Sequence, residues 1–123
     1  MRFYVSRHVN ESSASYVHAL AGRCVESIRA VYPTSRITIV EDRVASEHTL
    51  APPDPRVRVV SNPYPGSGEM GTAHVAMQSD IDDESPMVIM HDSMTLLGPV
   101  TTDAGPLGVR ALWVFNRYVY HHL

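Results

Sequence analysis

Residues 86–97 read PMVIMHDSMTLL, and this stretch decides how the rest of the chain is interpreted. Residues 87–90 form an apolar run without a polar break, which is typical of a strand covered on both faces. His91, Asp92 and Ser93 follow at once. A charge at the end of a buried strand is costly unless it is paired or binds a ligand. Because ligands of open parallel sheets sit at the carboxyl ends of the strands, Asp92 is the first candidate for a functional residue.

Length and composition indicate one domain over residues 1–123. A chain of 123 residues buries about two-thirds of its unfolded surface. No apolar run approaches the roughly 20 residues of a membrane span. The single cysteine, Cys24, cannot form an internal disulfide, which favours a cytoplasmic location. The net charge of −3, with no basic stripe, argues against a nucleic-acid partner.

The basic residues exclude several classes of protein. All 10 of them are arginine, and the chain contains no lysine. A P-loop, a Schiff-base enzyme and a phospho-receiver domain of the usual kind each need a lysine. Any phosphate bound here must therefore be neutralised by arginine, by a metal or by backbone N–H groups.

Hydrophobic periodicity predicts an alternation of strands and helices. The connections at residues 43–55 and 61–68 are rich in turn formers and are predicted to be irregular. Right-handed crossovers then give the sheet order 3-2-1-4. The predicted fold class is α/β, a Rossmann-like three-layer sandwich with a mostly parallel sheet. The predicted strands cover residues 2–5, 36–40, 56–60, 87–90 and 109–115, and the predicted helices cover residues 13–31 and 69–79.

The order 3-2-1-4 places a topological switch point between the first and fourth strands. Polar residues close three of the strands at that edge, so we expect them to meet there. They are Ser6, Arg7, His8, Glu41, Asp42, His91, Asp92 and Ser93.

Three segments and the element order carry a resemblance to a known family. The segments are the acidic pair closing residues 39–42 (IVED), the loop and helix start at residues 65–69 (PGSGE), and residues 88–94 (VIMHDSM). The chain resembles the donor-binding, N-terminal half of the GT-A-fold glycosyltransferases, from Phe3 to about Val100. In that family the fourth strand ends in an Asp-x-Asp motif, whose carboxylates hold a divalent metal that bridges the diphosphate of the donor.

The resemblance implies transfer of a sugar from a nucleoside diphosphate sugar to an acceptor hydroxyl. It implies Asp92 beside the diphosphate, Glu41 and Asp42 beside the nucleoside, and Arg7 beside phosphate or base. Gly68 and Glu69, where the loop enters the second helix, join the expected substrate-binding residues.

The metal expected from the family is Mn²⁺ or Mg²⁺, with Asp92 as its ligand. Met94 stands where the second Asp of the motif would be, and a hard cation prefers oxygen ligands. Three alternatives are left open: a metal held by Asp92 alone or with His91, a metal-independent site, and an inactive site.

Each candidate residue also has a structural interpretation. Asp92 could accept backbone N–H groups in a turn. Arg7 could pair with Asp92, clamp a phosphate or lie on the surface. Glu41 and Asp42 could solvate a strand end. The glycine-rich loop at residues 66–68 could approach phosphate with its N–H groups or act as a hinge.

Three further expectations concern the chain. Family members continue well beyond the fourth strand, so the chain is expected to be a fragment of a longer enzyme or a reduced relative. The alternative function is a non-catalytic nucleotide-binding or protein-interaction module on the same scaffold. A C-terminal aromatic cluster predicts a homodimer, or packing of this segment over the strand at residues 87–90; it consists of Trp113, Phe115, Tyr118 and Tyr120.

Overall fold

The computed structural model describes residues 1–10, 12, 14–79, 82–100 and 108. Both predicted helices and the first four predicted strands are present, and a short 3₁₀ helix lies in the connection predicted to be irregular. The predicted strand at residues 109–115 lies outside the described residues. In chain order the elements are β1 (Arg2–His8), α1 (Ala14–Val31), β2 (Arg36–Asp42), η1 (Ser46–His48), β3 (Val57–Ser61), α2 (Glu69–Gln78) and β4 (Met87–His91).

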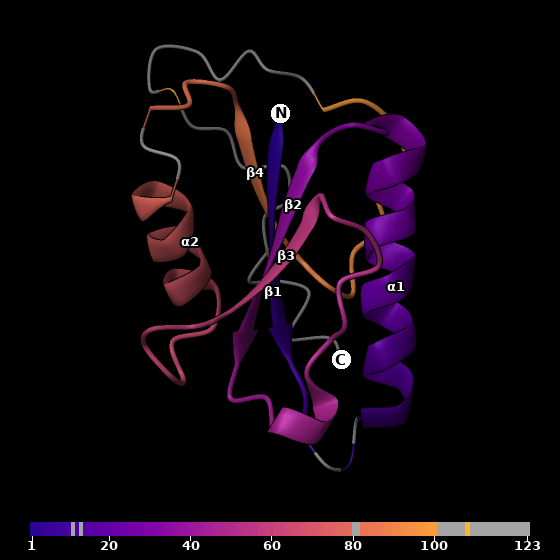
Figure 1. Ribbon diagram of the computed structural model, residues 1–123, viewed down its shortest axis with the longest axis vertical. Coiled ribbons are helices and arrows are strands. Elements are labelled where there is room, and N and C mark those ends of the chain that lie inside the picture. Colours follow the sequence, from indigo (N-terminus) through magenta and orange to yellow (C-terminus); the bar gives the residue numbers. More distant parts are fainter. Residues whose placement is uncertain (11, 13, 80–81, 101–107, 109–123) are drawn as a thin grey trace, which may run out of the picture.

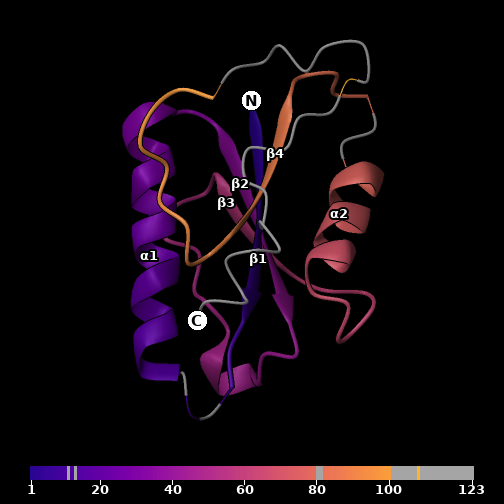
Figure 2. The same cartoon turned by 180° about the vertical axis from the view of Figure 1, so that it is seen from behind.

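The four strands form one sheet in the order β3-β2-β1-β4. Every neighbouring pair is parallel. Helix α1 covers one face of this sheet and α2 covers the other, which gives three layers (Figures 1 and 2). The predicted α/β sandwich with order 3-2-1-4 is therefore confirmed.

The strands are longer at their carboxyl ends than the sequence predicts. β1 continues through His8, β2 through Asp42 and β4 through His91. These polar residues stay in the ladder because Arg7 pairs with Glu41 and Ser6 with His91 in the parallel register. Side chains of successive strand residues point to opposite faces, so the polar residues are divided between the two faces of the sheet. The expectation of one common cluster is wrong in this respect.

The main hydrophobic core lies between the sheet and α1. It contains buried side chains from all four strands and from α1: Phe3, Val5, Cys24, Val25, Ile28, Ile37, Ile39, Val57, Val88 and Met90. After β4 the chain turns back and runs beside α1 (Figures 1 and 2). The Leu96 N–H donates to Ser27 Oγ at 2.9 Å, and the Val100 N–H donates to Tyr32 Oη at 2.8 Å. Residues 94–100 thus close the open side of the core.

Helix α2, on the opposite face, makes a close contact with Asn62, the residue that follows β3. A Cβ atom added at Gly71 would lie 2.1 Å from Asn62 Oδ1. Asn62 is buried, and its Oδ1 accepts the Tyr64 N–H at 2.9 Å while its Nδ2 donates to Ser67 Oγ at 3.1 Å. Gly71 therefore allows α2 to lie directly on the residue that organises the preceding loop.

Two glycine-to-alanine substitutions in helices should have opposite effects. Gly71→Ala should lower the free energy of unfolding by about 1–3 kcal/mol, because the new methyl group overlaps Asn62. Gly22→Ala should raise it by about 0.5–1 kcal/mol, because alanine loses less backbone entropy and nothing lies within 4 Å of the new Cβ. Urea denaturation of both variants measures the two values; stabilisation by Gly71→Ala would contradict the close contact.

Candidate functional site

On the α1 face, the carboxyl ends of three adjacent strands carry a row of charged residues. Arg7 of β1 lies directly opposite Glu41 of β2. On the other side of Arg7, Asp92 directly follows His91, the residue of β4 that is opposite Ser6. The row is thus Glu41, Arg7 and Asp92, with the cation between the two carboxylates.

Arg7 pairs with Glu41 and not with Asp92. Its Nη1 donates to Glu41 Oε1 at 2.5 Å and to the His48 carbonyl at 3.0 Å, and its Nη2 contacts His18 Nδ1 at 3.0 Å. The side chain is fully buried. Arg7 is therefore neither a partner of Asp92 nor a surface residue. Its guanidinium is also not open to clamp a phosphate.

Glu41 joins the sheet to the connection between β2 and β3. Besides Arg7, its Oε1 accepts the Leu50 N–H at 2.8 Å. The residue is buried, so it does not simply solvate the end of β2. Glu41 and Arg7 together hold η1 and Leu50 against the carboxyl ends of β1 and β2.

Like Arg7, whose buried Nε has no hydrogen-bond partner among the described residues, Asp92 is incompletely bonded. Its backbone N–H donates to the Ser6 carbonyl at 3.1 Å, and its carboxylate accepts a backbone hydrogen bond from Ser93. The residue is 9% exposed, yet Oδ2 has no hydrogen-bond partner among the described residues. Burial raises the pKa of Asp92 above its usual value, although the nearby Arg7 and His91 act in the opposite direction. The turn thus supplies a hydrogen-bond donor to one carboxylate oxygen of Asp92 and leaves the other without one.

Cys24 of α1 lies next to this row. Burial, and secondly the charge of Asp92, raise the pKa of its thiol to about 12. Its Sγ contacts the His91 carbonyl at 3.7 Å. A thiol with so high a pKa is a poor nucleophile, so Cys24 acts as a core residue.

On the α2 face, Asp42 holds the glycine-rich loop. Its Oδ1 accepts the Gly66 N–H and its Oδ2 accepts the Gly68 N–H, both at 2.7 Å. Burial opposes ionisation, but these two hydrogen bonds and the charge of Arg43 keep the pKa of Asp42 below its usual value. Two N–H groups that could have approached a phosphate are therefore bound to Asp42.

Two histidines also lie at this end of the α2 face. His8 Nδ1 donates to the Asp42 carbonyl at 2.6 Å, because a carbonyl can only accept. His91 Nε2 lies against the carboxylate of Glu69 at the start of α2. Ser6 is buried and Ser93 is exposed.

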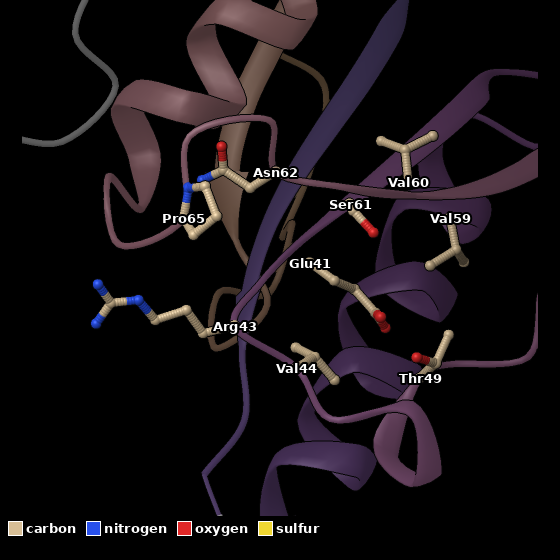
Figure 3. Close-up of a pocket in the computed structure, with 9 residues that line it drawn as sticks. All are labelled: Glu41, Arg43, Val44, Thr49, Val59, Val60, Ser61, Asn62 and Pro65. Carbon is tan, nitrogen blue, oxygen red and sulfur yellow. The ribbon is translucent and has the colours of Figure 1, made fainter.

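A cavity of about 270 Å³ lies at the carboxyl ends of β2 and β3. In Figure 3 the Glu41 side chain extends toward Thr49, between Val44 and Val59, while Arg43 extends in the opposite direction, below Pro65. The cavity is therefore displaced from Asp92, and Glu41 and Arg7 lie between them. The lining residues are Glu41, Arg43, Val44, Thr49, Val59, Val60, Ser61, Asn62 and Pro65.

Sequence analysis missed several residues of this edge. Arg43 has φ +54°, a left-handed conformation that is uncommon for a residue other than glycine. Asn62 directly follows β3, so the rule that selected Asp92 would also have found it. His18 follows the buried Val17 on α1, and no sequence signal distinguishes it from the other polar residues of that helix. His48 lies in a connection without periodicity, and no sequence signal marks it.

Comparison with protein-family models, with curated proteins and with solved structures gave no match. None of the described helices is long and apolar enough to cross a membrane. Within the described part of the chain, no three His, Cys, Asp or Glu residues are grouped so that they could hold a metal ion.

The lowered pKa of Asp42 leads to a pH-dependent prediction. A carboxyl group whose pKa is lower in the folded than in the unfolded state adds stability above its unfolded pKa, about 3.9, and this stability is lost as the pH falls. Asp42→Asn should lower the free energy of unfolding at pH 7 by about 1.5 kcal/mol, through the loss of a charge-assisted hydrogen bond. The difference from wild type should shrink as the pH falls toward 3. Urea denaturation at several pH values measures it, and a difference independent of pH would contradict this role of Asp42.

Proposed function

We propose that this domain binds a nucleoside diphosphate sugar at the carboxyl edge of its sheet. The observation that carries this proposal is the buried Oδ2 of Asp92, which has no hydrogen-bond partner among the described residues. It lies at the switch point between β1 and β4, where open parallel sheets bind ligands. A buried carboxylate oxygen without a partner is costly, and a ligand that donates a hydrogen bond, or a bound cation, would offset that cost.

The nucleoside is proposed to occupy the cavity between β2 and β3. Val44 and Val59 offer apolar walls for a planar base, and Glu41 and Ser61 offer polar atoms for its edge or for the ribose. From the cavity to β4 is about two and a half strand spacings, or about 12 Å. A diphosphate attached to the nucleoside is long enough to run along the edge toward Asp92.

The phosphate-binding role first expected of Arg7 is proposed for Arg43 instead. Arg7 is fully buried and bound to Glu41, whereas Arg43 is exposed and lines the cavity. A Cβ atom at Gly66 would come 2.3 Å from Arg43 Nη2, so the guanidinium lies against the glycine-rich loop. Its charge would reach a diphosphate that passes this loop as it leaves the cavity.

The finer proposal is a GT-A-type transfer of the sugar to an acceptor hydroxyl. Asp92 would supply one oxygen ligand to Mn²⁺ or Mg²⁺, and Met94 would supply none. When bound, such a metal would balance the charge of the diphosphate. Through that metal Asp92 would orient the diphosphate, and Glu41 would orient the nucleoside. A cytoplasmic location is the expectation that goes with this function.

A non-catalytic nucleotide-binding module is the second candidate. It is favoured because the described structure uses several expected ligand-binding groups internally. Arg7 is bound to Glu41, and the Gly66 and Gly68 N–H groups are bound to Asp42. Such a module would bind the nucleotide without hydrolysis or transfer.

Calorimetry tests the binding proposal directly. We expect heat on titration with UDP, GDP or their sugar conjugates, with weak dependence on Mn²⁺ because Met94 replaces the second carboxylate of the motif. Arg43→Gln should weaken binding about tenfold, through the loss of one charge-assisted contact. Asp92→Asn keeps the shape of the side chain and should abolish any metal-dependent part of the binding.

Arg56→Gln is the matched control, because Arg56 is also exposed but does not line the cavity. It should bind like wild type. The absence of heat with every nucleotide at millimolar concentration would overturn the proposed function. Equal weakening by both arginine variants would show that net charge, and not the cavity, determines the binding.

A homodimer through the C-terminal aromatic segment is proposed as well. The segment lies outside the described residues, and the support comes from β4. No strand among the described residues pairs with its outer edge, and Met87 and Ile89 are each 41% exposed on that strand. Light scattering should give twice the monomer mass. A monomer whose Trp113 fluorescence is fully accessible to a quencher would contradict both the dimer and the packing of this segment on β4.

A further inference from the structure

The contact between His18 and Arg7 determines where the proton of His18 lies. Arg7 Nη2 and His18 Nδ1 are 3.0 Å apart. A guanidinium has five N–H donors and no acceptor, so it must donate to Nδ1. His18 is therefore neutral in this structure, with its proton on Nε2.

This contact belongs to the group that holds the connection between β2 and β3. Arg7 donates to the His48 carbonyl, and its partner Glu41 accepts the Leu50 N–H. Val44 and Thr49 of the same connection line the cavity. The His18 and His48 rings are also in contact, with centroids 5.7 Å apart. His18 thus supports the Arg7 side chain, and Arg7 fixes the wall of the cavity that Val44 and Thr49 form.

We propose that protonation of His18 releases this wall and thereby regulates binding in the cavity. A protonated His18 cannot accept from Arg7, and it places a second cation beside a buried guanidinium. His48 on η1 also faces His18 and adds to the repulsion when it is protonated. The carboxylate of Glu41 at the end of β2 is paired with Arg7, and that of Asp92, just after β4, also interacts with Arg7. The ligand in this inference rests on the proposed function, but the release of the wall does not.

Two other histidines at this edge have contacts of the opposite kind. His8 Nδ1 donates to the Asp42 carbonyl, so protonation leaves that hydrogen bond intact. His91 Nε2 faces the Glu69 carboxylate, which can only accept, so this contact does not need an unprotonated nitrogen. A fall in pH over the range in which histidines titrate should therefore weaken the contact at His18 while these two persist.

The first test measures the tautomers by NMR. Long-range ¹H–¹⁵N spectra at pH 8 distinguish a protonated Nδ1 from a protonated Nε2. We expect an unprotonated Nδ1 on His18 and a protonated Nδ1 on His8. A protonated Nδ1 on His18 at pH 8 would overturn the inference whether or not any nucleotide binds.

The second test follows the Leu50 amide, whose hydrogen bond to Glu41 Oε1 reports on the wall. Between pH 8 and pH 5, after correction for intrinsic exchange, its protection should fall about tenfold in wild type, because one charge-assisted hydrogen bond is lost. His18→Asn offers an amide oxygen near the Nδ1 position and does not titrate, so it should retain the protection at pH 5. His8→Asn is the matched control and should behave as wild type. Equal loss of protection in wild type and in His18→Asn would contradict the inference.

The third test separates regulation from the proposed function. The affinity of wild type for a nucleoside diphosphate should fall between pH 8 and pH 5, and that of His18→Asn should stay nearly constant. If no nucleotide binds but the Leu50 protection follows the expected pattern, the proposed function fails and the release of the wall stands. If nucleotide binds equally well at both pH values in wild type, the regulatory inference fails and the proposed function stands.

Discussion

The buried ion pair between Arg7 and Glu41 is the constraint on which this edge of the molecule depends. Removing both charges from water is expensive, and their attraction repays the cost only when the remaining polar atoms are also bonded. Here the His48 carbonyl, His18 Nδ1 and the Leu50 N–H supply most of those bonds, while the buried Arg7 Nε has no partner among the described residues. Loss of either charged partner would leave an unpaired buried charge, at a cost of about 3–5 kcal/mol. The pair therefore ties four segments together: β1, β2, α1 and the connection that contains η1.

The architecture could be predicted because it follows from local periodicity and from chirality. The apolar positions of α1 recur at helical spacing, and Met87–His91 begins with an apolar run of the kind found in covered strands. Right-handed crossovers then leave one sheet order. The strand ends were predicted less well. Polar residues such as Ser6 and Glu41 suggest that a strand has ended, yet pairing with neighbouring strands keeps them in the ladder.

The candidate site was predicted as a set of residues but not as a set of contacts. The alternation of strand side chains separates Arg7 and Asp92 on one face from Asp42 and His91 on the other, and a prediction that ends the strands early cannot show this. The choice of Glu41 as the partner of Arg7 depends on a connection without sequence periodicity, because Leu50 completes the bonding of that carboxylate. Such contacts join residues far apart in the sequence, and only the folded structure brings them together.

Asp92 differs from Asp42 and Glu41 in how completely its carboxylate is bonded. Asp42 has both of its oxygens bonded to loop N–H groups, and Glu41 is paired with the Arg7 guanidinium. Both residues add to stability where they are. Asp92 is buried, its pKa is raised, and one of its oxygens has no partner in the described structure. Asparagine or serine would serve a turn at this position with a smaller desolvation cost. The incomplete bonding of this carboxylate at the switch point is what supports the proposed ligand site.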